Sequence, residues 1–293
     1  MRWNNEGEWP IITAEGLAKD LADLEQQYVD HLIKRFGKWE VWAEASQRVA
    51  DGQDVGEDEV PEAFRAELKM MKVILEMEAL GKFDWNNPRL RQIFGEIVTE
   101  QFYLFFGEMI TSIALRVARA AGVKTLLEIG AGRANLTNIM LRQMGKAGVK
   151  LPLVVTDAQP VILENVEKLK SSHPEAELTT ALWNIMEPPP AVLLEKLTGP
   201  TLLYERYTLN YAALKAFENI ARVADVLILW DWFNCTGKLY AYDEVFKRIG
   251  SQPLFFKDVK PLLDRHFPHY LIFDQRAQEA IHLPNITMLL AWK

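Results

Sequence analysis

One short segment of the chain carries residue types that could bind a charged small molecule. It reads Leu-Leu-Glu-Ile-Gly-Ala-Gly-Arg-Ala-Asn over residues 126–135, an apolar run followed by a turn with two glycines and then by a helical pattern. Glycine permits a tight turn and lets a ligand approach the backbone. A helix N-terminus offers unpaired N–H groups and a partial positive charge. The segment therefore predicts a turn that holds the polar end of a ligand.

Glu128 bears on which ligand this turn receives. The dinucleotide fingerprint is G-x-G-x-x-G, and Asn135 stands where its third glycine belongs. A carboxylate two residues before the first glycine would repel a pyrophosphate but attract an ammonium or a sulfonium. The residues therefore argue against a nicotinamide dinucleotide and favour a ligand with a cationic end.

The Glu128-Ile-Gly130-Ala-Gly132 segment resembles the first motif of class I S-adenosylmethionine-dependent methyltransferases, and the resemblance covers about residues 123–293. It implies S-adenosyl-L-methionine as the cofactor, with Asp157 on the ribose hydroxyls and Asn184 near the adenine amino group. The chain departs from the family pattern at Ala134, where many members have a third glycine, and at Asn184, where the family often has aspartate. The cofactor-binding residues that the resemblance implies are Glu128, Gly130, Ala131, Gly132, Asn135, Asp157, Ala158, Asn184, Ile185 and Glu205.

Three of these residues also have a purely structural interpretation. Asp157 could cap a turn or the next helix, Asn184 could cap a turn before Pro188, and Glu128 could pair with Arg133. The sequence leaves both interpretations open at each position.

Methyl transfer requires a positioned acceptor and a group that removes its proton. The candidate catalytic residues are Glu205 and Asp231, which come directly after predicted strands, and His266. A carboxyl would need a pKa raised by burial to act near neutral pH. Aromatic rings suit a cationic donor and a flat acceptor. The predicted substrate-binding residues are Tyr103, Phe106, Tyr207, Tyr211 and Trp232.

The segment after the fourth predicted strand narrows the acceptor class. Family members that methylate nucleobases or glutamine amides often carry a D/N/S-P-P-Y/F motif there, and residues 204–211 read Tyr-Glu-Arg-Tyr-Thr-Leu-Asn-Tyr instead. The leading interpretation is an enzyme that transfers a methyl group to an oxygen or nitrogen of a small molecule. One alternative is a methyltransferase acting on a protein or peptide, and another is a non-catalytic cofactor-binding scaffold protein. No metal site is predicted.

The elements that would position these residues alternate between strands and helices after residue 122. Strand-like runs cover 125–129, 153–156, 178–181, 201–204, 225–230, 270–273 and 286–291. Alternation predicts a parallel sheet covered on both faces. No long helical pattern separates the last two runs, which favours an antiparallel pair. The expected fold is α/β, a Rossmann-like sheet of seven strands, mostly parallel, with an antiparallel last strand.

The first 122 residues have a different pattern. Apolar residues recur at helical spacing from Leu17 through Leu21, Leu24 and Tyr28 to Leu32, and similar patterns cover 62–80 and 89–121. An acidic segment at 51–61 reads as a loop. We therefore expect residues 1–122 to form a helical lid and acceptor-binding subdomain, and residues 123–293 to form the cofactor-binding methyltransferase domain.

Composition limits the partners of this 293-residue chain. Its net charge is −7, which disfavours duplex nucleic acid because phosphate neutralisation needs a basic face. The longest run without Asp, Glu, Lys or Arg, residues 280–292, is shorter than a membrane-spanning helix. Cys235 is the single cysteine, and the start of the chain lacks the apolar core of a signal peptide. These features predict a cytoplasmic protein with a small-molecule partner and no membrane partner; a homodimer is left open.

Overall fold

The computed structural model describes residues 13–81, 88–89, 92–93, 101–212 and 214–293, with the backbone alone for 101 and 102. Part of the helix predicted over 89–121 lies outside these ranges. In the described residues no helix is long and apolar enough to cross a membrane.

A sheet of eight strands forms the centre of the molecule. In chain order the strands are β1 (Thr125–Ile129), β2 (Leu153–Asp157), β3 (Leu178–Leu182), β4 (Thr201–Arg206), β5 (Val226–Asn234), β6 (Leu254–Phe255), β7 (His269–Ile272) and β8 (Asn285–Trp292). Their spatial order is β3-β2-β1-β4-β5-β8-β7, with β6 beside the end of β5. Strand β8 runs antiparallel to both of its neighbours, and the other pairs are parallel. The predicted mostly parallel sheet with an antiparallel last strand is confirmed.

Two details of the sheet differ from the prediction. The two-residue strand β6 is too short to leave a periodic pattern, so the sheet has eight strands rather than seven. The connection between the last two strands, predicted to lack a helix, contains α13 (Gln275–Ile281). That helix is mostly polar, and Ala277 is its buried residue, so it shows no apolar spacing from which to predict it.

Helices surround the sheet. Those before the first strand are α1 (Ala14–Phe36), α2 (Trp39–Ala50), the short 3₁₀ turns η1 (Glu57–Glu59) and η2 (Glu62–Phe64), α3 (Arg65–Ala79) and α5 (Gln101–Ala120). Those between the strands are α6 (Asn135–Ala147), α7 (Pro160–Leu169), α8 (Ala191–Leu194), α9 (Leu209–Ala212), α10 (Ala216–Val223), α11 (Ala241–Lys247) and α12 (Phe256–His266). Two short helices, α9 and α10, lie between β4 and β5.

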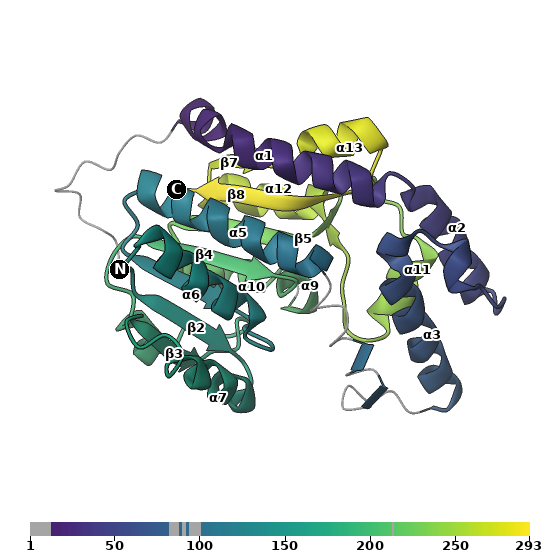
Figure 1. Ribbon diagram of the computed structural model, residues 1–293, viewed down its shortest axis with the longest axis horizontal. Coiled ribbons are helices and arrows are strands. Elements are labelled where there is room, and N and C mark those ends of the chain that lie inside the picture. Colours follow the sequence, from purple (N-terminus) through teal and green to yellow (C-terminus); the bar gives the residue numbers. More distant parts are fainter. Residues whose placement is uncertain (1–12, 82–87, 90–91, 94–100, 213) are drawn as a thin grey trace.

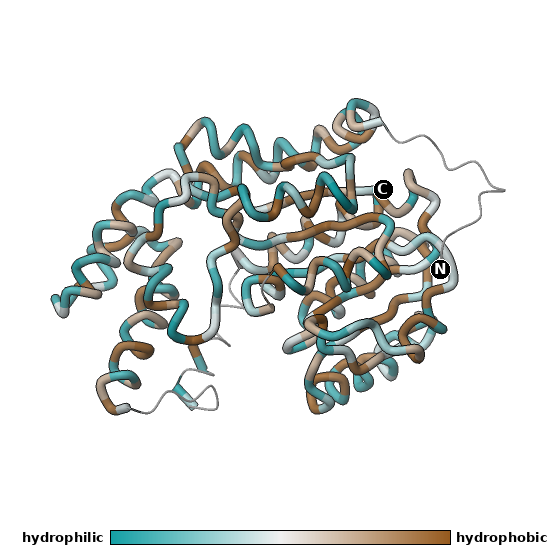
Figure 2. The backbone as a smooth tube through the Cα atoms, turned by 180° about the vertical axis from the view of Figure 1, so that it is seen from behind, coloured by the Kyte–Doolittle hydropathy of each residue, from teal (hydrophilic) through white to brown (hydrophobic). Residues whose placement is uncertain are grey.

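Alternation along each strand creates two apolar layers. Leu126 of β1 packs in a core with buried residues of α1, α5 and α6, whereas Leu127 and Ile129 pack in a second core with buried residues of α10 and α12. Figures 1 and 2 show the apolar central strands between these helices. Glu128, between Leu127 and Ile129, must therefore point to the same side of the sheet as Leu126.

Residues before position 122 contribute to both the sheet core and a separate helical group. The Tyr28 hydroxyl of α1 is 2.6 Å from the Thr287 hydroxyl of β8, so α1 is tied directly to the sheet. Helices α2, α3 and α11 instead lie together beyond the carboxyl ends of the parallel strands (Figure 1). Ligands of open α/β sheets bind at that edge, so this helical group stands where it can enclose a bound molecule.

Candidate functional site

The turn after β1 has the backbone geometry that its glycines permit. Gly130 and Gly132 have φ of 66° and 53°. A Cβ built on Gly130 would lie 2.3 Å from the hydroxyl oxygen of Thr208, closer than any real contact, so only glycine fits there. Ala134 also adopts a left-handed conformation, with φ of 59°. This explains physically why a glycine is common at that position in the family that the sequence resembles.

Glu128 is a buried carboxylate at the start of this turn. Its Oε2 accepts a 2.9 Å hydrogen bond from the Tyr204 hydroxyl. Burial raises the pKa of Glu128 to about 7, although the hydrogen bonds from Tyr204 and Thr137 and the nearby positive charge of Arg206 oppose that rise. Both Glu128 and Arg206 line a cavity. A cationic group entering the cavity would favour the charged form of Glu128.

Asp157 lies beside the glycine turn at the end of β2. Its Oδ2 accepts a hydrogen bond from the Gly132 N–H (3.2 Å), and its Oδ1 accepts one from the Gln159 N–H (2.9 Å). The carboxylate thus joins the two loops that would flank a cofactor ribose. Asn184 is exposed and its Oδ1 accepts from the Met186 N–H (3.1 Å), as in a turn cap. Asp157, Ala158, Asn184 and Ile185 lie outside the cavity lining.

The cavity has a volume of about 390 Å³ and runs from the glycine turn to the helical group. Its lining comprises residues from both halves of the chain. Of the predicted cofactor-binding residues, it includes Glu128, Gly130, Ala131, Gly132 and Asn135. Of the predicted substrate-binding residues, it includes Tyr103, Tyr207, Tyr211 and Trp232. Phe106 is fully buried and stacks on Trp230, with ring centroids 4.6 Å apart, outside this lining.

One wall of the cavity contains a stack of aromatic rings. Trp42 of α2 lies between Phe64 and Tyr242, at centroid distances of 5.6 and 5.8 Å. Tyr240 continues the stack 5.7 Å beyond Tyr242. Phe64, Trp42 and Tyr242 line the cavity. These rings come from three separate segments, so the wall exists only in the folded chain.

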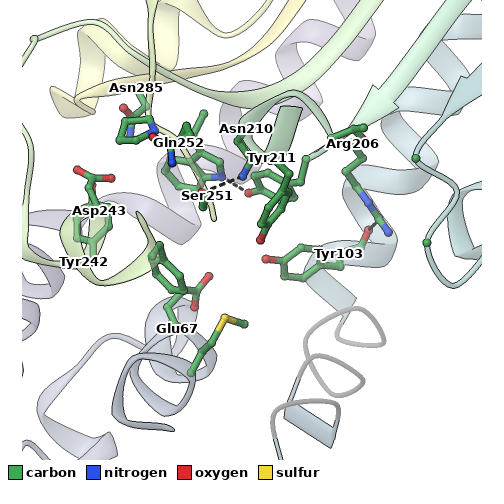
Figure 3. Close-up of a pocket in the computed structure, with 18 of the residues that line it drawn as sticks. Glu67, Tyr103, Arg206, Asn210, Tyr211, Tyr242, Asp243, Ser251, Gln252 and Asn285 are labelled. Atoms are coloured by element: carbon green, nitrogen blue, oxygen red, sulfur yellow. Dashed lines mark hydrogen bonds between the residues drawn. The ribbon is translucent and has the colours of Figure 1, made fainter. Parts of the chain in front are cut away.

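Two carboxyl groups face the cavity from the same helical group. Glu67 comes from α3 and Asp243 from α11, and Figure 3 shows both side chains at the cavity with Tyr103 and Tyr211 opposite Glu67. The Oδ2 of Asp243 accepts from the Tyr240 N–H (2.9 Å), which caps α11. Burial raises the pKa of Asp243 to about 6. A proton-accepting carboxylate is therefore available in the cavity near neutral pH.

Tyr207 lines the cavity and comes directly after β4. It has a left-handed backbone, with φ of 54°, and its hydroxyl accepts a hydrogen bond from the Trp232 indole N–H. Such a conformation strains a bulky residue, and strained residues cluster at functional sites. Burial raises the pKa of Tyr207 well above its usual value.

The three predicted catalytic residues are not among the residues lining the cavity. Glu205 is fully buried, and its Oε2 accepts from the Thr208 N–H (2.7 Å). Asp231 is also buried and accepts from the N–H groups of Asn210 (3.0 Å) and Trp232 (2.8 Å). The two carboxyls thus hold the loop after β4 from beneath. His266, at the end of α12, lies 3.1 Å from a carboxylate oxygen of Glu218.

The buried pair of Glu205 and Asp231 should make the stability of the protein depend on pH. Burial and the neighbouring Asp231 raise the pKa of Glu205 well above its usual value, and burial raises that of Asp231 to about 7. Since both pKa values rise on folding, the stabilisation is complete below about pH 4 and is lost as the pH rises through about 7. Glu205→Gln keeps an acceptor for the Thr208 N–H and removes the repulsion.

We therefore expect the unfolding free energy to fall less between pH 5 and pH 8.5 in Glu205→Gln than in the wild type, by about 1 to 2 kcal/mol. Urea unfolding at the two pH values measures the difference. Glu164→Gln, at an exposed site on α7, is the control and should match the wild type. Equal pH slopes in Glu205→Gln and the wild type would contradict this account of the pair.

Sequence reasoning missed much of the aromatic chamber, the part of the cavity lined by Trp42, Phe64, Tyr242, Glu67 and Asp243. The aromatic wall and the carboxyls of Glu67 and Asp243 belong to helices whose apolar spacing predicted packing and not a site. Arg206 was missed although it stands directly after Glu205 at the end of β4. Asn210 also lines the cavity, and its amide donates to the Ser251 hydroxyl (3.2 Å; Figure 3).

Comparison with known proteins shows which solved structures share this fold. Neither a protein-family model nor a curated protein matches the sequence. The structure is similar to the citrinin polyketide synthase CMeT domain, with a TM-score of 0.61 and 13% identity over 95% of this chain and 94% of that one. It is similar to the CurJ carbon methyltransferase, with a TM-score of 0.58 and 12% identity over 96% and 94%. It is also similar to the DszA carbon methyltransferase, with a TM-score of 0.61 and 13% identity over 85% and 68%.

These similarities cover both the sheet and the preceding helices, because the first two extend over nearly the whole of each chain. The chain has the methyltransferase fold that the glycine turn and the alternation of strands and helices predicted. At these identities the likeness concerns the fold alone.

Proposed function

We propose that the protein is an enzyme that transfers a methyl group from S-adenosyl-L-methionine to a nitrogen or oxygen of a small molecule. The observation that carries the proposal is the continuous cavity that joins the glycine turn and Glu128 to the aromatic chamber. The cofactor end and the acceptor end of one reaction would then share a single enclosed space.

The residues at the turn fit this cofactor. Gly130 has no room for a side chain, and a Cβ on Gly132 would have no atom closer than 3.9 Å, so the turn presents bare backbone to a ligand. Glu128 would hold the amino group, Arg206 the carboxylate and Asp157 the ribose. When bound, the cofactor supplies a methyl group on a positively charged sulfur. Asn135, at the start of α6, completes the lining at this end.

The chain's own residues would orient the acceptor and keep water out. Tyr103, Tyr207, Tyr211 and Trp232 would contact the acceptor, and the helical group of α2, α3 and α11 would close the chamber. We assign Glu205 and Asp231 to holding the loop after β4, because neither lines the cavity. Glu67 and Asp243 are the carboxylates placed to accept a proton. The helices of residues 1–122 would thus serve as the acceptor-binding part.

Calorimetric titration tests the cofactor class directly. Micromolar binding of S-adenosyl-L-methionine and of S-adenosylhomocysteine, with no binding of NAD, is the expected result. Failure of both ligands to bind would overturn the proposed function and would favour a structural role for the glycine turn.

Asp157→Ala should weaken S-adenosylhomocysteine binding about tenfold, because a hydrogen-bonded carboxylate on the ribose contributes roughly 1.5 kcal/mol or more. The same titration measures the change. Asp157→Asn should recover part of the affinity, since its amide oxygen still accepts a hydrogen bond. Unchanged affinity in Asp157→Ala would show that the residue only joins the two loops.

Methyl transfer to carbon is a second candidate. The similarity of the fold to carbon methyltransferases over nearly the whole chain favours it. The two candidates differ in the methylated product, which mass spectrometry of a fragmented product distinguishes.

A further inference from the structure

The charges that line the cavity are unevenly distributed. Beside the glycine turn, carboxylate and guanidinium groups lie together, as Glu128, Arg133 and Arg206. Among the described residues that line the rest of the cavity, the ionisable acids are Glu67 and Asp243, and no Lys, Arg or His is present. Among the described residues, the acceptor end therefore presents two carboxyls.

Both carboxyls of the acceptor end line the same cavity as the aromatic stack and come from segments that contribute rings to it. Phe64 ends the 3₁₀ turn η2, and Glu67 lies three residues later in the first turn of α3. Asp243 comes directly after Tyr242 in the first turn of α11. The faces of aromatic rings carry negative potential and attract cations. Rings and carboxylates thus favour the same kind of ligand, a cation with a flat body.

From this arrangement we infer that the methyl acceptor is a small amine with an aromatic body, bound as its ammonium form by Glu67 and Asp243 and methylated on nitrogen. The inference rests on the proposed function and narrows it. An acceptor with a carboxylate or phosphate in the same place would meet the two carboxylates of the described lining.

Glu67 is the carboxylate that would remove a proton from the ammonium group before methyl transfer. Glu67 and Tyr207 both line the cavity, and the charge of Glu67 adds to the larger effect of burial in raising the pKa of Tyr207. Figure 3 shows the Glu67 carboxylate directed into the space that Tyr103 and Tyr211 also face. Asp243 lies further from them and would hold the charge of the incoming amine.

The transfer balances with these groups. Glu67 takes one proton from the ammonium, which leaves a lone pair on nitrogen. The nitrogen forms a bond to the methyl carbon as the carbon–sulfur bond breaks, and the electron pair of that bond stays on sulfur. The products are a protonated methylamine and a neutral thioether, and Glu67 returns its proton to water.

Matched ligands test the inference on the full chain saturated with S-adenosylhomocysteine. Tryptamine, tryptophol and indole-3-acetate share one ring and differ in the charge of the side chain; tyramine, tyrosol and 4-hydroxyphenylacetate form a second set. We expect the amine to bind at least about tenfold more tightly than the alcohol in at least one set, and the acid to bind most weakly. No preference for the amine in either set, or no binding of either amine, would overturn the inference.

Variants connect that preference to the two carboxyls. Glu67→Gln combined with Asp243→Asn should lower amine affinity to that of the alcohol and leave alcohol and S-adenosylhomocysteine affinity unchanged. Asn at 243 still offers an oxygen to the Tyr240 N–H that caps α11. Glu244→Gln, next to Asp243 but exposed, is the matched control and should keep the preference. A preference that survives the double substitution would also overturn the inference.

The same titrations separate this inference from the proposed function. If S-adenosylhomocysteine does not bind the wild type, the proposed function has failed. If it binds and the amine is not preferred, only the acceptor class is wrong.

Discussion

Glu128→Gln should weaken S-adenosylhomocysteine binding by about ten- to a hundredfold at pH 8. The substitution keeps the shape of the side chain and an oxygen for the Tyr204 hydroxyl, and it removes only the charge. A hydrogen bond between charged groups contributes about 1.5 to 3 kcal/mol, which sets the expected range. Calorimetry of the two proteins measures the loss.

The pH dependence of binding identifies Glu128 as the source of that loss. Because its pKa is about 7 without ligand, binding a cation below pH 7 requires the loss of a proton from Glu128. Wild-type affinity should therefore fall as the pH is lowered from 7, approaching about tenfold per pH unit. The Gln variant should lack this dependence. Identical pH profiles would show that Glu128 stays charged without ligand or does not contact the amino group.

Glu128→Gln should weaken cofactor binding but should not lower the folding stability of the protein above pH 7. The pKa of Glu128 is raised on folding, so its contribution to stability is complete below about pH 4.5 and is lost as the pH rises through about 7. Above pH 7 the Gln variant should be at least as stable as the wild type. A higher unfolding free energy together with a lower S-adenosylhomocysteine affinity would distinguish a functional carboxylate from a structural one. Loss of a structural group lowers both quantities.

The parts of the fold that the sequence predicts are those with local patterns. The runs that became β1, β2, β4 and β5 carry apolar residues at neighbouring positions, and the glycine turn has a fixed place after the first of them. The short strand β6 and the polar helix α13 bury too little apolar surface to produce a pattern. Helix α9 is only four residues long and is likewise too short to produce a pattern.

The candidate site also has one part that local sequence patterns predict and one part that they do not. The proposed cofactor end lies within a few residues of one turn, so the order of residues in the chain is enough to place Glu128, Gly130 and Gly132 together in the cavity lining. Its acceptor end combines α2, α3 and α11, which are far apart in sequence, and no spacing relates Glu67 to Asp243. Glu205 and Asp231 were predicted as bases because they come after strands. Their backbone hydrogen bonds instead turn both carboxyls under the loop after β4.

Substitution of Arg206 is the second change that we expect to weaken cofactor binding strongly. Its side chain is partly buried, and its Nη1 donates to the Tyr103 carbonyl oxygen (3.3 Å) while its charge lowers the pKa of Glu128. A guanidinium held beside a carboxylate at one end of a cavity can bind both ends of an amino acid, the carboxylate on Arg206 and the ammonium on Glu128. Arg206→Met should then weaken S-adenosylhomocysteine binding about a hundredfold.

5′-Methylthioadenosine, which has the nucleoside and the sulfur but no amino-acid group, separates this role from a structural one. Arg206→Met should bind it as tightly as the wild type does, because the lost contact involves only the carboxylate. Arg206→Lys should recover part of the S-adenosylhomocysteine affinity, since it restores the charge but not the two-point geometry. If both ligands lose affinity by the same factor in Arg206→Met, the arginine instead maintains the cavity through its contacts with α5. The carboxylate of the cofactor must then be bound by another group.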